Sequence, residues 1–138
     1  MFSLLQETEI GHVSLGKKAD LMIIAPATAN TVAKLAHGMA DNMLLTTALA
    51  CRSPILLAPA METGMWENQA TRANLQTLRD RELHMIGPVE GYLASGGSGA
   101  GRMSEPDEIF NAARYLLSRG EPLNGMRVVV SAGGTREA

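Results

Sequence analysis

Three short apolar runs, each ended by proline or by glycine and proline, are the clearest pattern in this chain. They cover residues 20–26, 54–59 and 83–86, and Gly87-Pro88 ends the third. Continuous apolar runs of this length are typical of strands that are buried on both faces, as in a parallel sheet. A further run, Met126 to Val130, predicts another strand near the end of the chain.

Between these runs, apolar residues recur at the three- and four-residue spacing of amphipathic helices. In chain order, the signals are a helix ended by Gly38, a second capped by Asp41, a third from Thr71 to Arg81, and a fourth capped by Ser104 and continuing to about Arg119. The positions expected to face the core are Val32, Leu35 and Ala36; Leu44, Leu45, Ala48 and Leu49; Leu75 and Leu78; and Ile109, Ala113, Leu116 and Leu117. Residues 87–104 hold six glycines and predict a loop.

Strands that alternate with helices predict an α/β domain with a doubly wound parallel sheet. In that architecture ligands bind beyond the carboxyl ends of the strands. The segments after Ala25 and after Ala58 are therefore the first places to look for chemistry.

Composition narrows the class of protein. The 138 residues are 46% hydrophobic and 19% charged, with a net charge of −2, which is typical of a globular domain. Lys and Arg are scattered, so we expect neither a nucleic-acid nor a membrane partner. The single cysteine excludes an internal disulfide and fits a reducing, cytoplasmic location. The three histidines lack metal-ligand spacing, so no metal site is expected.

Two loops are candidates for ligand binding. Pro26 to Asn30 places small and hydrogen-bonding residues at a helix N-terminus, where backbone N–H groups attract anions. On spacing alone, a plain capped helix start is the commoner explanation. Gly96 to Arg102 is neither a P-loop nor a dinucleotide fingerprint, and suits a mobile flap that bears one cation. An ordinary surface loop remains an equal alternative.

An apolar cluster of Met61, Met65 and Trp66 surrounds Glu62 just after the second strand. Such clusters are more often core packing than binding sites. Its position at a strand end favours a ligand pocket, where a buried Glu62 would have a raised pKa because desolvation disfavours the carboxylate.

Four segments occur in the order and approximate spacing of one known family: His12 to Leu15, Ala25 to Thr31, Pro59 to Trp66, and Leu93 to Gly96 running on to Gly101-Arg102-Met103. The chain resembles the flavin-containing cysteine decarboxylases, and among them the bifunctional phosphopantothenoylcysteine decarboxylase/phosphopantothenate–cysteine ligases of coenzyme A synthesis. The resemblance implies a flavodoxin/Rossmann-like three-layer flavoprotein domain over residues 1–120. Residues 121–138 resemble the start of a ligase domain.

The resemblance also implies a reaction and its residues. FMN oxidises the cysteinyl thiol of phosphopantothenoylcysteine, the carboxylate leaves as CO2, and the electrons return to give 4′-phosphopantetheine. By position, the FMN contacts would be Thr28, Ala29, Asn30, Thr31 and Ala60; the catalytic residues His12 and Ser95; and the substrate contacts Glu62, Arg102 and Met103. The family forms homotrimers or larger trimer-based assemblies.

Two positions depart from the family pattern. Glu62 stands where an Asn often contacts the substrate carboxylate, so its charge must be neutralised, turned away or compensated. Ser95 stands where the family has a proton-donating Cys, and a hydroxyl is a weaker acid than a thiol. A non-catalytic flavin-binding subunit, or an inactive fragment, is therefore the alternative. The family pattern also places roughly 60 residues, two strand–helix units, before the His12 motif, so we expect a chain truncated at both ends.

Overall fold

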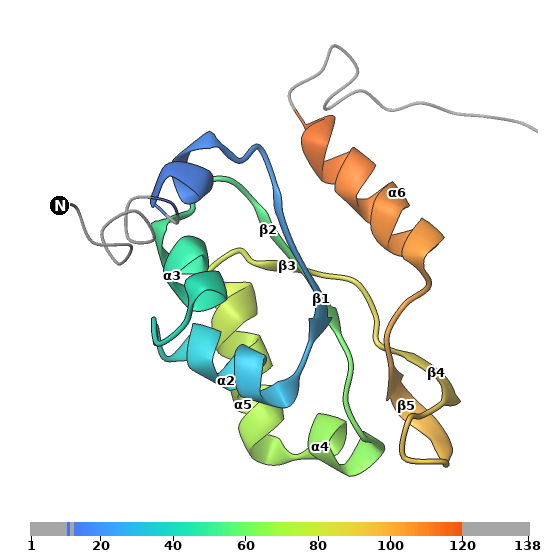
Figure 1. The fold of residues 1–138 in the computed structure, drawn as a ribbon. Helices are drawn as coiled ribbons and strands as arrows, with labels where there is room; N and C mark the ends of the chain where they lie inside the picture. Colours follow the sequence, from blue (N-terminus) through green and yellow to red (C-terminus); the bar gives the residue numbers. More distant parts are fainter. Residues whose placement is uncertain (1–10, 12, 120–138) are drawn as a thin grey trace, which may run out of the picture.

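The computed structural model describes residues 11 and 13–119, and Figure 1 shows their arrangement. Three parallel strands form one sheet in the order β1-β2-β3: β1 (Met22–Ala27), β2 (Ile55–Pro59) and β3 (His84–Met85). The three predicted strands are thus confirmed, although each is one or two residues shorter than its apolar run. The expected strand at Met126 to Val130 lies outside the described residues.

Helices cover both faces of this sheet, which confirms the three-layer α/β prediction (Figure 1). One layer contains α2 (Ala29–Ala36), α3 (Met43–Ala50), α4 (Thr63–Glu67) and α5 (Gln69–Asp80). On the other face lies α6 (Pro106–Leu117). Residues 13–18 are also helical.

Strand β2 is the centre of the core, and all five of its residues are buried. Ile55 and Leu57 pack in one cluster with α2 and α5, whereas Leu56 and Ala58 pack in a second cluster with α6. This division follows from the two-residue period of a strand, which sends successive side chains to opposite faces. A strand that serves two layers must be apolar throughout, which is why its sequence is a continuous run.

The helix faces were predicted with mixed success. Leu75 and Leu78 on α5, and Ile109, Ala113 and Leu116 on α6, are buried as expected. Three predictions were wrong, because Leu44, Leu49 and Leu117 are exposed. Helix α3 is apolar on nearly every side, so its sequence period cannot select the face that packs.

Two predicted helix caps were also wrong by one residue. Asn42, not Asp41, caps α3, since its side chain accepts the Leu45 N–H at 2.9 Å. Asp41 instead pairs with Lys34. Glu105, not Ser104, precedes α6, and Ser104 is buried beneath the chain.

The glycine-rich stretch is a β-hairpin, not the loop expected over residues 87–104. Strands β4 (Val89–Tyr92) and β5 (Ser98–Arg102) pair antiparallel. The Leu93 N–H donates to the Gly97 carbonyl at 2.8 Å and closes the tip. Glycine lacks the alternating side chains that identify a strand, so the sequence pattern concealed this pairing.

Candidate functional site

The first part of the site lies where β1 ends and α2 begins. Thr28 caps α2, because its hydroxyl accepts the Thr31 N–H at 3.3 Å and lies 3.1 Å from the Thr31 hydroxyl. Thr28 and Asn30 are exposed, and Ala29 and Thr31 are half-buried. All four residues therefore lie at the surface of a strand end, where helical N–H groups favour an anion or a polar ring edge.

The end of β2 lies directly beside this first part. The Ala60 N–H donates to the Ala27 carbonyl at 3.0 Å, which joins the two strand ends. The predicted cofactor contacts Thr28 and Ala60 therefore lie close together, because Ala60 is bonded to Ala27, the residue before Thr28. Small side chains at Ala29 and Ala60 leave the backbone accessible to a flat ligand.

The segment after Ala60 is less buried than its sequence suggests. Trp66 is buried and Arg72 stacks on its ring, with the guanidinium carbon 4.4 Å from the ring centroid. Met65 and Glu62 are exposed, so the carboxylate is not buried among its apolar neighbours. Glu62 instead caps α4, because its Oε2 accepts the Gly64 N–H at 2.6 Å.

The β4–β5 hairpin is docked against this segment. Met61 donates its N–H to the Gly101 carbonyl at 2.9 Å. A Cβ atom at Gly101, where φ is +142°, would collide with the Met61 carbonyl, and one at Gly99 would collide with the Thr63 hydroxyl. These two glycines permit a backbone approach that no larger residue allows. The expected mobile flap is therefore a strand pair with a fixed base.

Docking of the hairpin creates a pocket of about 370 Å³, which we call the hairpin pocket. It brings together five residues that were singled out from the sequence: Ala60, Glu62, Ser95, Arg102 and Met103. Four of its other lining residues, Met61, Leu93, Ala94 and Gly101, lie in the sequence motifs but had no assigned contact, and Tyr92 was missed. Tyr92 is the last residue of β4, so recognition of that strand could have indicated it.

The hairpin pocket does not include every predicted residue. Thr28, Ala29, Asn30 and Thr31 lie at the same edge of the sheet, and Ala60 is the link between the two groups. His12 lies outside the described residues. Within the described part of the chain, no three His, Cys, Asp or Glu side chains are grouped as metal ligands would be.

Comparison with known proteins identifies the family of this chain. A family model described as Flavoprotein matches residues 2–118. The chain belongs to the flavoprotein family. The match includes all ten predicted site residues.

Relatives of this flavoprotein chain include biosynthetic enzymes. It is 48% identical to the coenzyme A biosynthesis bifunctional protein CoaBC of Haemophilus influenzae, over 96% of this chain and 33% of that protein. A solved PPC decarboxylase variant, complexed with pantothenoylaminoethenethiol, has a TM-score of 0.74 and 40% identity over 75% of this chain and 58% of its own. The FMN binding protein AtHal3 has a TM-score of 0.68 and 39% identity over 75% of this chain and 57% of its own. The chain thus spans about a third of the curated relative.

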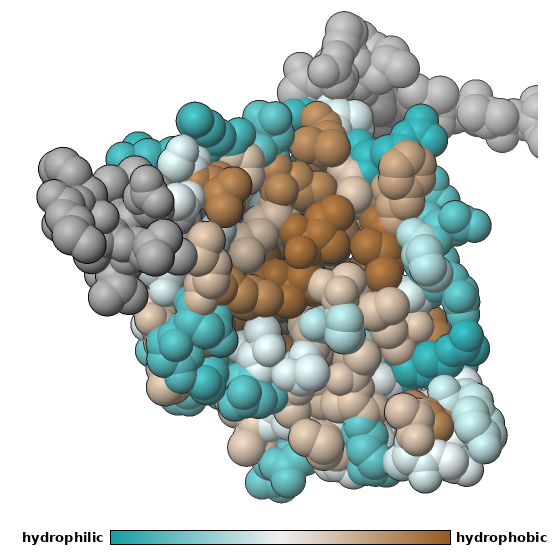
Figure 2. All heavy atoms as spheres, in the orientation of Figure 1, coloured by the Kyte–Doolittle hydropathy of each residue, from teal (hydrophilic) through white to brown (hydrophobic). Residues whose placement is uncertain are grey.

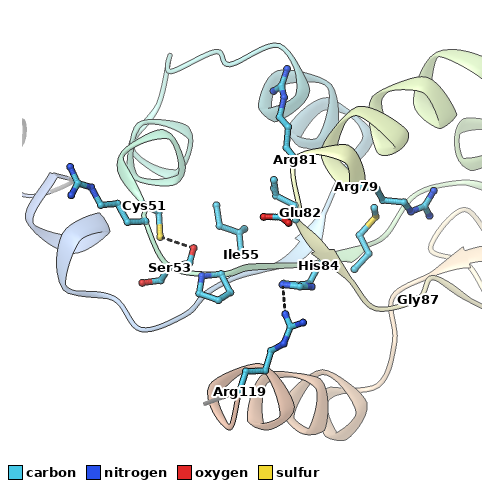
Figure 3. Close-up of a pocket in the computed structure, with 13 residues that line it drawn as sticks. Cys51, Ser53, Ile55, Arg79, Arg81, Glu82, His84, Gly87 and Arg119 are labelled. Carbon is cyan, nitrogen blue, oxygen red and sulfur yellow. Dashed lines mark hydrogen bonds between the residues drawn. The ribbon is translucent and has the colours of Figure 1, made fainter. Parts of the chain in front are cut away.

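A larger concavity of about 900 Å³ lies at the opposite edge of the sheet of this flavoprotein domain, near the residues that precede β2 and β3. Figure 3 shows Arg119 reaching from the end of α6 to His84, whose Nε2 lies 3.5 Å from the guanidinium Nη1. None of the predicted site residues lines this cavity. Strand-end geometry therefore favours the smaller hairpin pocket as the functional site, despite its size.

Hydrophobic side chains also gather on the face shown in Figure 2, over β1 and beside α6. Ile23 of β1 is among the exposed large apolar residues. Within the described residues, no helix is both long and apolar enough to span a membrane.

Proposed function

We propose that this chain is an FMN-dependent decarboxylase that converts 4′-phosphopantothenoylcysteine to 4′-phosphopantetheine in coenzyme A biosynthesis. The observation that carries the proposal is the hairpin pocket, which gathers residues from two of the four sequence motifs beside the β1 strand end, where a third motif lies. Residues 1–120 form the decarboxylase domain, and residues 121–138 begin a ligase domain of a bifunctional enzyme. The CoaBC relative and the PPC decarboxylase structure support this assignment.

FMN fits the residues at the two strand ends. Thr28, Asn30 and Thr31 offer exposed or half-exposed polar groups, and the small residues Ala29 and Ala60 leave room for a planar ring. These five residues would hold the cofactor. When bound, FMN supplies the reversible oxidation of the substrate thiol that makes loss of CO2 feasible.

The hairpin pocket then binds the substrate. Arg102 is the only cation among its lining residues, so it pairs with a carboxylate or phosphate of the substrate. Met103 and Leu93 supply apolar wall, which excludes water from the reacting carbon. Glu62 lines the same pocket, but its carboxylate accepts the Gly64 N–H at 2.6 Å, which compensates part of its charge.

In the proposed reaction, Ser95 and His12 transfer protons. Ser95 is exposed on the hairpin tip and lines the pocket, so its hydroxyl would donate the proton that carbon takes up when the enethiol intermediate is reduced to the thiol product. His12 lies outside the described residues, and its role as base or orienting group follows from the motif alone.

A non-catalytic flavin-binding subunit is the second candidate. Ser95 favours it, because a hydroxyl is a poorer proton donor than the family's thiol. The two candidates share the cofactor and differ in turnover.

Assembly as a homotrimer, or a larger trimer-based oligomer, and a cytoplasmic location complete the proposal.

The purified protein tests both candidates in one experiment. We expect yellow flavin absorbance and CO2 release from phosphopantothenoylcysteine, with 4′-phosphopantetheine as product. Bound flavin without CO2 release would favour the non-catalytic subunit. Absence of both flavin and turnover would reject the proposed function.

A further inference from the structure

The side chain of Arg102 is held between two features of the chain. On one side, its Nη2 lies 2.5 Å from Oε1 of Glu105. On the other side, it crosses the backbone of β4 at Gly91, where an added Cβ would lie 2.7 Å from Arg102 Cδ and 3.2 Å from Nη1. A side chain at position 91 would displace the arginine, so Gly91 leaves this path open and the contact with Glu105 defines where the guanidinium lies.

Glu105 is itself attached to a rigid element. It precedes the first turn of α6, and its N–H donates to Oε2 of Glu108 at 2.9 Å, which is one arm of a capping box. Helix α6 is in turn fixed by Ile109, Ala113 and Leu116, which are buried against the sheet. Glu105 therefore connects a wall residue of the hairpin pocket to the packed core.

We propose that Glu105 is a positioning residue, and that with Gly91 it fixes Arg102 at the wall of the hairpin pocket for binding the anionic group of the substrate. This inference rests on the proposed function, in which Arg102 binds that group. An arginine has five N–H donors, and Glu105 engages only Nη2, so other donors remain for the substrate. Fixing the side chain in advance removes the entropy cost of ordering it when substrate binds.

The exposure of the pair indicates a role in binding more than in stability. The side chains of Arg102 and Glu105 are 46% and 56% exposed, and ion pairs so open to water stabilise a fold little. The same exposure leaves Arg102 accessible to a ligand. The close fit over Gly91 is thus better explained by the need to aim a guanidinium than by the need to hold the hairpin.

A substitution that separates capping from positioning is Glu105→Asp. Asp is a favourable residue at this cap but is one methylene shorter, so it keeps the helix start and loses Arg102. We expect KM for phosphopantothenoylcysteine to rise about fivefold with kcat nearly unchanged, and the Kd measured by calorimetry to rise by the same factor, as for loss of uniform binding. Glu105→Gln, which keeps the length and an acceptor oxygen, should restore most of the affinity.

Two further variants show whether the effect passes through Arg102. In an Arg102→Ala background, Glu105→Asp should change neither KM nor Kd, because the partner is already absent. Glu108→Ala removes the other capping arm and does not touch Arg102. It should lower the melting temperature while KM stays at the parent value.

The outcomes separate this inference from the proposed function. A parent protein that binds the substrate without releasing CO2 overturns the function, and a weaker Kd in Glu105→Asp then still supports the positioning role. An unchanged or lower Kd in Glu105→Asp overturns the positioning role, as does the same loss of affinity in Glu108→Ala. A parent protein that does not bind the substrate overturns both.

Discussion

Docking of the glycine hairpin can be tested at a single residue, Gly101. Alanine there would adopt a backbone conformation with φ of +142° and would place its Cβ against the Met61 carbonyl. The backbone strain costs roughly 1–3 kcal/mol. The loss of the Met61-to-Gly101 hydrogen bond adds about 1 kcal/mol. We therefore expect Gly101→Ala to weaken docking by about 2–4 kcal/mol.

The hairpin should detach before the domain unfolds, because Gly99 and Gly101 bring its base into contact with residues 61–63. The Met61 amide reports this event directly, since it donates to Gly101 at 2.9 Å. A loss of 2–4 kcal/mol, at about 1.4 kcal/mol per factor of ten, predicts exchange of this amide with solvent deuterium roughly 30- to 1,000-fold faster.

Gly97→Ala is the matched control in the same hairpin, because nothing lies within 4 Å of a Cβ added there. Its Met61 amide should exchange at the parent rate. If Gly101→Ala also left that rate unchanged, the glycine contacts would not hold the hairpin, and our explanation of the pocket would fail.

Three further predictions concern single side chains. Thr28→Ala should lower the free energy of unfolding by about 1 kcal/mol in urea titrations, while Thr28→Ser, which keeps the cap, should not. Arg72→Ala should lower it by about 0.5–1 kcal/mol and shift the fluorescence of Trp66, the only tryptophan. Under the proposed function, Ser95→Ala should lower kcat roughly 10- to 100-fold and Ser95→Cys should raise it above the parent value, both measured by CO2 release; equal rates in all three proteins would exclude Ser95 as the donor.

The parallel sheet and two of its helices were predictable because burial leaves a clear trace in the sequence. Strand β2 lies between two layers, so its run from Ile55 to Pro59 is apolar throughout. Helix α5 has only one buried face, and the spacing of Leu75 and Leu78 identifies that face. Both patterns follow from how many faces of the strand or helix are buried.

The hairpin and the caps were not predictable for physical reasons. Glycine has no side chain to alternate, and its role in β5 depends on the distant residues Met61 and Thr63, which no local pattern reveals. Neighbouring polar residues, such as Asp41 beside Asn42, can both cap a helix, and only the packed chain selects one.

The candidate site shows the same division. Family motifs brought Glu62, Ser95 and Arg102 to attention, and the structure places them around one pocket. The role of Glu105 could not be predicted from the sequence, because its contact with Arg102 forms only when β5 and α6 are folded.

The closed tip of the hairpin has a consequence for how this protein can change over evolution or in the laboratory. The Leu93 N–H and the Gly97 carbonyl close the tip with a hydrogen bond of its own, and a Cβ added at Gly96 or Gly97 would meet nothing within 4 Å. Residues at the tip, such as Ser95, can therefore be substituted to change the proton donor or the ligand preference while the docked base of the hairpin stays the same.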